Sequence, residues 1–98
     1  MRIMFEGEIF RWTAREQDWY LVALPADLSE EIREIPRMPR GFGSVRVEVA
    51  IGSSRWRTSI FPDASRGVYV LPLKRAVRDA EGIGVEGVVT VDLEILDV

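Results

Sequence analysis

The sequence contains no histidine and no cysteine among its 98 residues. Without them the usual pairs of nucleophile and general base, the common zinc ligands and any disulfide are absent. The chain also has no glycine-rich phosphate-binding loop and no nucleophile elbow. Since only carboxylates, hydroxyls and carbonyls remain as metal ligands, we expect no metal site, no cofactor and no enzymatic activity.

Long apolar runs are missing as well. None approaches the roughly 20 residues of a membrane-spanning helix. The N-terminal sequence carries Glu6 and Glu8 where a secretory signal needs an unbroken apolar core, so we expect a cytoplasmic protein. The net charge of −3 argues against general binding of duplex nucleic acid, because that binding needs a net basic face.

Repeats, low-complexity tracts and linkers are absent, so residues 1–98 are expected to form a single domain. Alternation of apolar and polar residues predicts strands, and one further strand is apolar on both faces. The predicted strands cover residues 2–12, 19–24, 44–51, 56–60, 68–73 and 88–96. Strands that each bury one face predict a mainly β fold, a small closed β-barrel of about six strands with two short helices.

The first helix is expected over residues 27–34, because Asp27 can cap it and Glu30 follows three residues on. The second is expected over residues 74–80, ended by Gly82 and Gly84. Residues 35–43, with two prolines and two glycines, are expected to form a long loop.

A hairpin is predicted where the strand 44–51 meets a turn over residues 52–55. Our register pairs Ile51 with Trp56, Val49 with Thr58 and Val47 with Ile60. A shift by one residue would bury arginines, which the cost of an unpaired buried charge forbids. Trp56 is then expected to be buried, and Arg57 to be exposed and diagonal to Glu48.

Basic side chains gather between residues 55 and 78. They are Arg55, Arg57, Arg66, Lys74, Arg75 and Arg78. They predict an anion site if the loop 65–67 lies against the helix that starts near Lys74. The alternative is a solvated face whose charges are balanced by nearby acids.

Hydroxyl and aromatic side chains each leave two interpretations open. Thr58 and Ser59 present hydroxyls to a ligand, or Thr58 is a buried residue bonded to a carbonyl. The aromatic side chains form a stacking platform, or they belong to the core. These are Trp12, Trp19, Phe42, Trp56, Phe61 and Tyr69. The carboxylate pairs Glu30/Glu31 and Asp92/Glu94 have no neighbour that would separate their pKa values, so they do not indicate acid–base catalysis.

The leading hypothesis is a non-enzymatic binding module for a small anionic ligand or an acidic peptide at one end of the barrel. Its expected site residues are Arg57, Thr58, Ser59, Tyr69, Lys74 and Arg78. The alternative is a structural or self-associating protein that uses exposed strand edges or aromatic surface.

Several segments also carry a family resemblance. They are FEGEI at 5–9, the strand from Trp19 that ends in Leu24 and Pro25, and the segments GSVRVEVAIG, WRTSIFP, GVYVLPLKRAVR and VEGVVTVDLEI. In order and spacing these segments resemble the DUF1905 family, prokaryotic β-barrel domains of unknown function that are sometimes fused ahead of a bacteriocin-protection domain.

The resemblance implies a double-split barrel, of the broad type also seen in AbrB-like transcription factors, and no assigned activity. Nucleic-acid binding would follow from that fold analogy alone and is our third hypothesis. The chain departs from similar sequences at Val88, where they often have aspartate. It also ends at Val98 without the second domain, so we expect it to act alone or with a separate partner.

Overall fold

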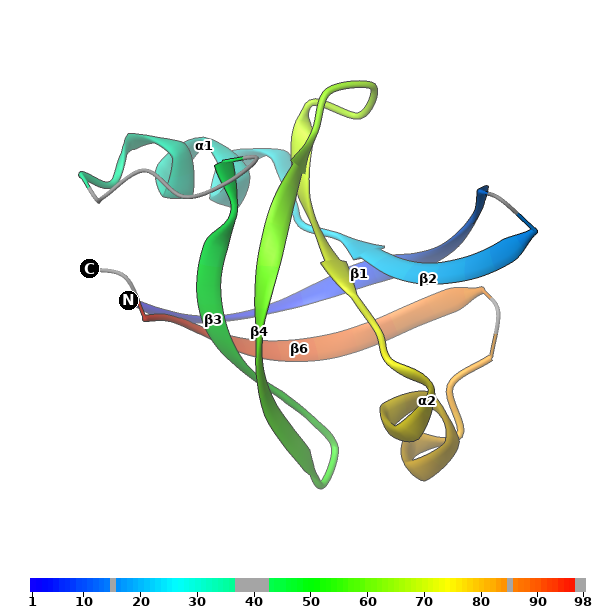
Figure 1. Cartoon of the computed structure of the whole chain (residues 1–98). Helices are drawn as coiled ribbons and strands as arrows, with labels where there is room; N and C mark the ends of the chain where they lie inside the picture. The colour runs from blue at the N-terminus through cyan, green and yellow to red at the C-terminus, as the bar shows by residue number, and fades with distance from the viewer. Residues whose placement is uncertain (15, 37–42, 85, 97–98) are drawn as a thin grey trace.

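The computed structural model describes residues 1–14, 16–36, 43–84 and 86–96. Within these ranges the elements are β1 Arg2–Ala14, β2 Gln17–Ala23, α1 Ala26–Glu34, β3 Val45–Ile51, β4 Ser54–Asp63, β5 Val68–Pro72, α2 Arg75–Glu81 and β6 Gly87–Ile95. The six strands close a barrel in the order β1-β2-β5-β4-β3-β6, and all neighbours are antiparallel (Figure 1). The predicted closed barrel of six strands with two short helices is confirmed.

Strand β1 is shared between two neighbours. Residues 2–9 pair with β6, whereas residues 9–14 pair with β2. Gly7 lies just before this change of partner, and a Cβ there would overlap Cγ1 of Val22 and come within 3.0 Å of the carbonyl oxygen of Ala23. The second half of β1 and the first half of β2 form a hairpin that extends beyond the barrel wall (Figure 1).

The core is built from inward side chains of all six strands. Val47, Val49, Ile60, Leu71 and Leu93 are at most 1% exposed. This agrees with the alternation in residues 45–51, where every second residue is buried. Helix α1 adds Leu28 and Ile32, which pack in the same cluster. Because apolar burial is the main favourable term in folding, this shared core holds the six strands and α1 together.

The predicted register between β3 and β4 is wrong by two residues. Ile51 faces Ser54, Val49 faces Trp56 and Val47 faces Thr58. The turn is therefore a two-residue loop, and Gly52 supplies the positive φ of 57° that such loops require. A shift of two residues keeps each side chain on its predicted face. It moves Arg57 from a diagonal position to one directly opposite Glu48. Trp56 is half-buried rather than buried, while Arg57 is exposed as predicted.

The helices differ from the predictions mainly at their starts. Helix α1 begins at Ala26 after Pro25 as N-cap, so Asp27 lies inside the first turn and does not cap it. Its carboxylate instead accepts a hydrogen bond from its neighbour Leu28 N, at 2.9 Å. Helix α2 ends as predicted, with Gly82 in the left-handed conformation at φ 63°. Residues 37–42 of the predicted 35–43 loop lie outside the described residues.

The two helices occupy opposite ends of the molecule. Figure 1 shows α1 at one end, on the side of the N-terminus, and α2 at the other end, below the β1–β2 hairpin. The turn between β4 and β5 lies at the same end as α1, and the turn between β3 and β4 lies at the end of α2. This separation decides which of the predicted site residues can meet.

Candidate functional site

A cleft opens where strands β2 and β4 diverge. Strand β5 pairs with β4 over residues 68–70 and with β2 over residues 70–72. Main-chain N–H groups of alternate residues face the same neighbouring strand, so after Val70 the next residue of β5 that could donate to β4 is Pro72, opposite Ser59. Proline has no N–H to donate. Strand β4 therefore continues toward its hairpin without β5 beside it. Helix α2 starts three residues after Pro72 and lies below the resulting gap.

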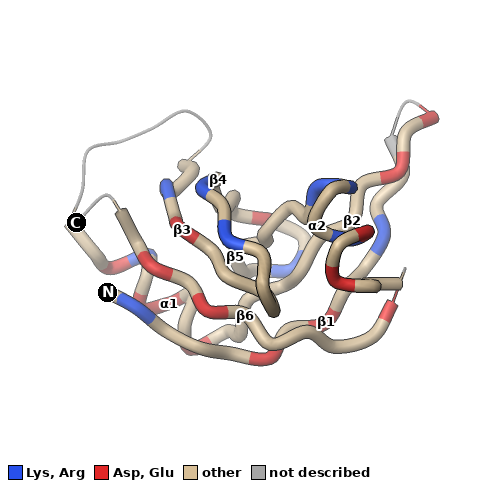
Figure 2. The backbone as a smooth tube through the Cα atoms, turned by 90° about the horizontal axis from the view of Figure 1, so that it is seen from below, with Lys and Arg blue, Asp and Glu red and all other residues tan. Residues whose placement is uncertain are grey.

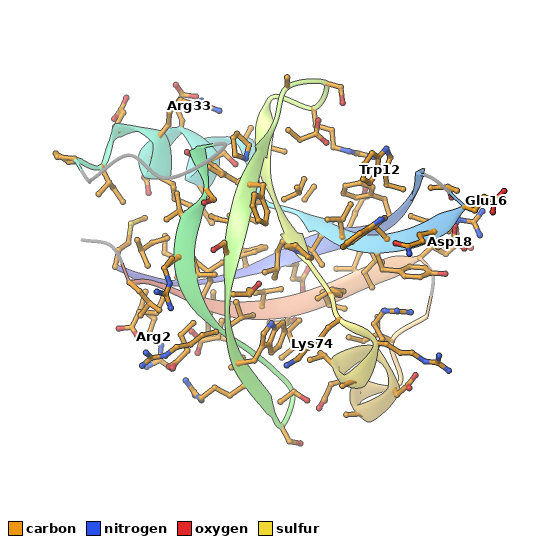
Figure 3. The ribbon with its side chains drawn as sticks, in the orientation of Figure 1. Arg2, Trp12, Glu16, Asp18, Arg33 and Lys74 are labelled. Carbon is orange, nitrogen blue, oxygen red and sulfur yellow. The ribbon has the colours of Figure 1, made fainter. Side chains whose placement is uncertain are left out.

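The cleft has a volume of about 770 Å³. Its first side is the start of β2, with Gln17, Asp18, Trp19 and Tyr20. Its second side is formed by Trp56, Arg57 and Thr58 of β4. The end of β5 and the first turn of α2 supply Pro72, Leu73, Lys74, Arg75 and Arg78. Figure 3 labels Asp18 and Lys74 on two sides of this cleft, with Arg33 far away beside α1.

Positive charge dominates the cleft, although the chain as a whole is acidic. Its lining holds four cationic side chains and one carboxylate, Asp18. Asp18 accepts a hydrogen bond from Thr13 at 2.7 Å and lies 4.0 Å from Arg11. Figure 2 shows basic positions on β4 and on α2, with acidic positions along β6. An anion that enters the cleft therefore meets an excess of cations.

The four cations differ in how far they are already neutralised. Arg57 lies 3.2 Å from Glu48, and Arg75 lies 3.6 Å from Asp79. Lys74 and Arg78 form no ion pair with a carboxylate of the described residues. Their charges are thus the most available for an anionic ligand.

Both of these cations lie beside an aromatic ring. The guanidinium of Arg78 lies 4.1 Å from the centroid of Tyr20, and its Nε donates to the carbonyl of Leu73 at 3.3 Å. The Nζ of Lys74 lies 6.0 Å from the ring of Trp56. A cation over an aromatic face is attracted by the ring quadrupole, so the rings orient the charges without neutralising them.

Glu81 joins the far end of α2 to the turn between β3 and β4. Its carboxylate accepts hydrogen bonds from the hydroxyl of Ser54 at 2.6 Å and from the main-chain N–H of Ser53 at 3.4 Å. A side chain at Gly52 would overlap this carboxylate. The helix that carries Lys74 and Arg78 is therefore tied to the hairpin that carries Arg57.

The outer face of β4 belongs to a row of ion pairs across the sheet. Glu48 accepts hydrogen bonds from Arg57 and Arg55, each at 3.2 Å, and these bonds lower the pKa of the Glu48 carboxyl below its usual range. Arg2 likewise lowers the pKa of Asp92 through two hydrogen bonds. For Arg55, and in part for Arg57, the structure therefore supports the alternative that these charges belong to a solvated face and are balanced by a nearby acid, Glu48.

Four of the six residues predicted for the site lie together in this cleft, namely Arg57, Thr58, Lys74 and Arg78. Ser59 is half-buried, does not line the cleft, and shares the outer face of β4 with Arg57. Tyr69 is 3% exposed and lies at the α1 end of β5, where its N–H donates to Ser29. Strand β5 runs from one end of the barrel to the other, so its first residues cannot reach the site at its last.

The loop 65–67 does not approach α2, so the predicted convergence is wrong. The guanidinium of Arg66 lies 3.6 Å from the ring of Phe10 and its Nε lies 3.7 Å from Asp63. Asp63 also accepts hydrogen bonds from the Oγ and N–H of Ser65, which lower its pKa. The polar groups of this turn are thus paired with one another at the end of the barrel opposite α2.

The sequence prediction does not include the β2 side of the cleft. Trp19 and Tyr20 line this side, whereas the sequence indicates Trp19 only as a member of an aromatic platform. Trp12 and Trp19 form an exposed cross-strand pair, 56% and 47% exposed. Trp56 is half-buried and Tyr69 is buried, while Phe42 lies outside the described residues. The aromatic residues therefore do not form one continuous platform within the described part of the chain.

Other chemistry finds little support in the described residues. They contain no group of three or more acidic side chains that could hold a metal ion. None of their helices is long and apolar enough to cross a membrane. Glu30 pairs with Arg33 and Asp92 with Arg2, so these carboxylates serve as partners of arginines. No buried side-chain polar atom of the described residues lacks a hydrogen bond.

The fold and the cleft define a small closed β-barrel of antiparallel strands with a cationic recess beside its second helix. The chain matches the family described as a domain of unknown function, DUF1905, over residues 5–93. Since this covers nearly the whole chain, the protein belongs to that family. A search of curated proteins finds no match to it.

Proposed function

We propose that this protein is a non-enzymatic binding module that holds an anionic ligand in the cleft between β2, β4 and α2. The observation that carries the proposal is the placement of Lys74 and Arg78. They have no carboxylate partner among the described residues, yet aromatic rings orient both of them at the cleft. Two oriented and uncompensated cations suit phosphate or carboxylate groups.

The lining of the cleft supports binding rather than catalysis. No serine lines it within the described residues, and the chain has neither histidine nor cysteine to act as base or nucleophile. Thr58 carries an aliphatic hydroxyl that lines the cleft, and the lining residues around it include cations and aromatic rings but no histidine or cysteine that could activate it. A cytoplasmic location stays a prediction from the N-terminal sequence.

Thermal shift and isothermal titration calorimetry with a defined set of anions test the proposal. Citrate, glucose 6-phosphate, adenosine diphosphate and a short polyglutamate cover carboxylates, phosphates and nucleotides. We expect at least one to raise the melting temperature of the protein, and we expect the double variant Lys74→Ala/Arg78→Ala to lose that shift.

The matched control is Arg33→Ala/Arg66→Ala, which removes two cations at the opposite end of the barrel. It should keep the shift. If none of the anions binds, the proposed function fails. If both double variants lose binding equally, the cleft is not the anion site, and the binding depends on net charge alone.

A second candidate function, contact with another protein copy, has one specific observation in its favour. Trp12 and Trp19 are exposed beside each other on the hairpin that extends from the barrel. Large exposed aromatic side chains often mark interaction surfaces. Light scattering after gel filtration tests this function: a dimer that dissociates in Trp12→Ser/Trp19→Ser supports it, and a monomer at millimolar concentration removes self-association.

A further inference from the structure

We propose that the ligand of the cleft is an extended acidic peptide segment that adds as a strand to the open edge of β4. This inference rests on the proposed anion-binding function and names its partner class. It is based on the main chain of β4, whereas the proposed function is based on the side chains of α2.

The direction of the β4 main chain follows from its hairpin with β3. The two-residue loop is closed by Ile51 and Ser54, which form a hydrogen-bonded pair. Hydrogen-bonded and non-hydrogen-bonded pairs alternate along an antiparallel ladder. Arg55, Arg57 and Ser59 therefore direct their N–H and C=O groups away from β3, toward the side on which the cleft opens.

That edge has no strand partner over residues 55–58. Pairing between β4 and β5 covers Phe61, Pro62 and Asp63, and the same register places Ser59 opposite Pro72, which has no N–H but keeps a carbonyl acceptor. Within the described part of the chain no strand pairs with residues 55–58 on this side. Four residues of strand extend about 13 Å, which is long enough for a partner strand of four or five residues. A free edge of this kind is a template for strand addition.

The charges around the edge select the sequence of the partner. The side chains of an added strand alternate between the two faces of the sheet. On the outer face they meet Arg55 and Arg57, which share a single carboxylate, Glu48. On the cleft side they meet Lys74. Both faces of the added strand thus favour acidic residues.

Charged residues on an edge strand also serve to prevent unwanted pairing. Here the same charges repel a basic strand and attract an acidic one, so protection and selection are compatible. A small anion would use the cations and leave the main-chain groups of Arg57 to water. An acidic strand uses both, and the structure therefore favours the peptide.

The test uses an acetylated and amidated six-residue peptide of alternating glutamate and threonine. Two derivatives carry N-methyl groups on every second amide, in opposite phases, so that each has the parent charge. We expect the parent to bind. One derivative should bind about tenfold or more weakly, because its methyl groups replace donors that face β4. The other, whose methyl groups face away, should bind like the parent.

The outcomes separate this inference from the function on which it rests. If citrate or adenosine diphosphate binds but the peptide does not, strand addition is overturned and anion binding stands. Equal binding of both methylated derivatives also overturns it, because charge alone would then explain binding. If no anion and no peptide binds, the proposed function itself fails. A single-stranded oligonucleotide that binds more tightly than the peptide would identify a nucleic-acid site and overturn the peptide.

Amide hydrogen exchange gives a second readout on the unmodified protein. The peptide should slow exchange at the N–H of Arg57 about tenfold or more, since that group becomes hydrogen-bonded. Thr13 provides a matched control, because it lies on the free edge of the β1–β2 hairpin opposite Asp18. Slowing at Thr13 equal to that at Arg57, or slowing at neither, contradicts strand addition to β4.

The Arg57→Pro variant tests the edge from the protein side. It removes the N–H of a residue that lines the cleft, and proline is tolerated on open edges. Arg57→Ala is its control, because it removes the same cation and keeps the N–H. Peptide affinity should fall about tenfold further in Arg57→Pro than in Arg57→Ala. Equal affinity of the two folded variants would contradict a main-chain bond at this position.

Discussion

The main-chain N–H of Tyr69 donates a hydrogen bond to the hydroxyl of Ser29, with an N to Oγ distance of 3.0 Å. Ser29 is fully buried on α1, and Tyr69 lies on β5. The bond ties the helix at one end of the barrel to a central strand. It also satisfies a donor that is closed off from water, and such donors are costly when left unpaired.

Replacing Ser29 by alanine should therefore lower the free energy of unfolding by about 1–3 kcal/mol, the usual cost of an unsatisfied buried donor. Chemical denaturation measures this change. Ser53→Ala, at an exposed turn position, should change stability by less than about 0.5 kcal/mol. Equal stability of the two variants would contradict a structural role for the Ser29 hydroxyl.

Gly7→Ala should also destabilise the protein. A Cβ at Gly7 would overlap Val22 and approach the main chain of Ala23, where neither neighbour can move freely. Crowding of this kind in a packed region costs about 1–3 kcal/mol. Gly84→Ala is the control, because its Cβ would meet nothing closer than 3.9 Å. Thermal denaturation of both variants should show a lower melting temperature for Gly7→Ala alone.

The Glu48 ion pairs should make part of the stability depend on pH. Because hydrogen bonds from Arg57 and Arg55 lower the pKa of Glu48 in the folded protein, its contribution is fully present above the ordinary value of 4.5. The contribution is lost as the pH falls from there through the lowered pKa. Glu48→Gln should therefore lose stability at neutral pH and show a shallower decline below pH 4.5 than the parent.

The control for this pH profile is Glu6→Gln. Glu6 is exposed on β1 and forms no ion pair with a described residue. Its variant should follow the parent profile in urea denaturation at each pH. If the stability of Glu48→Gln declined below pH 4.5 as steeply as that of the parent, the arginines would not lower the pKa of Glu48 in solution.

Truncation of Trp56 should cost more stability than truncation of its neighbour Arg57. Trp56 is half-buried and packs against the core, so Trp56→Ala should cost about 1–3 kcal/mol, less than the ~3–5 kcal/mol of a fully buried tryptophan. Arg57 is exposed beside Glu48, so Arg57→Ala should cost less than Trp56→Ala in chemical denaturation. A larger loss of stability in Arg57→Ala would contradict the observed packing of β4.

The sequence was sufficient to predict the barrel, because most strands carry a clear alternation of apolar and polar residues and the remaining strand is apolar on both faces, as a strand covered on both sides is. The predicted β3–β4 register is wrong by two residues, since an alternating pattern is identical after a shift of two residues. The turn decides the register. Gly52 and Ser53 alone form the loop, and Ser54 already pairs with Ile51.

Only part of the cleft could be predicted, because local sequence patterns show which residues of one element lie together but not which elements become neighbours. Lys74 is the N-cap of α2 and Arg78 lies four residues on, and Arg57 and Thr58 are neighbours on β4, so local patterns brought each pair together. The approach of Tyr20 depends on pairing between β2 and β5, whose paired residues lie about 50 positions apart along the chain. No local pattern indicates which strands become neighbours, and Tyr69 was assigned to the wrong end of its strand for that reason.

The double pairing of β1 also governs when the barrel can form during synthesis. Residues 2–9 find their neighbour in β6, the last strand made, and Ile95 N–H donates to the carbonyl of Met1. The β1–β2 and β3–β4 hairpins can form as soon as they emerge from the ribosome, but the seam between β1 and β6 must wait. Until then, the buried face of Phe5 and Ile9 has no cover from Val91 and Leu93, and the nascent chain exposes it to chaperones.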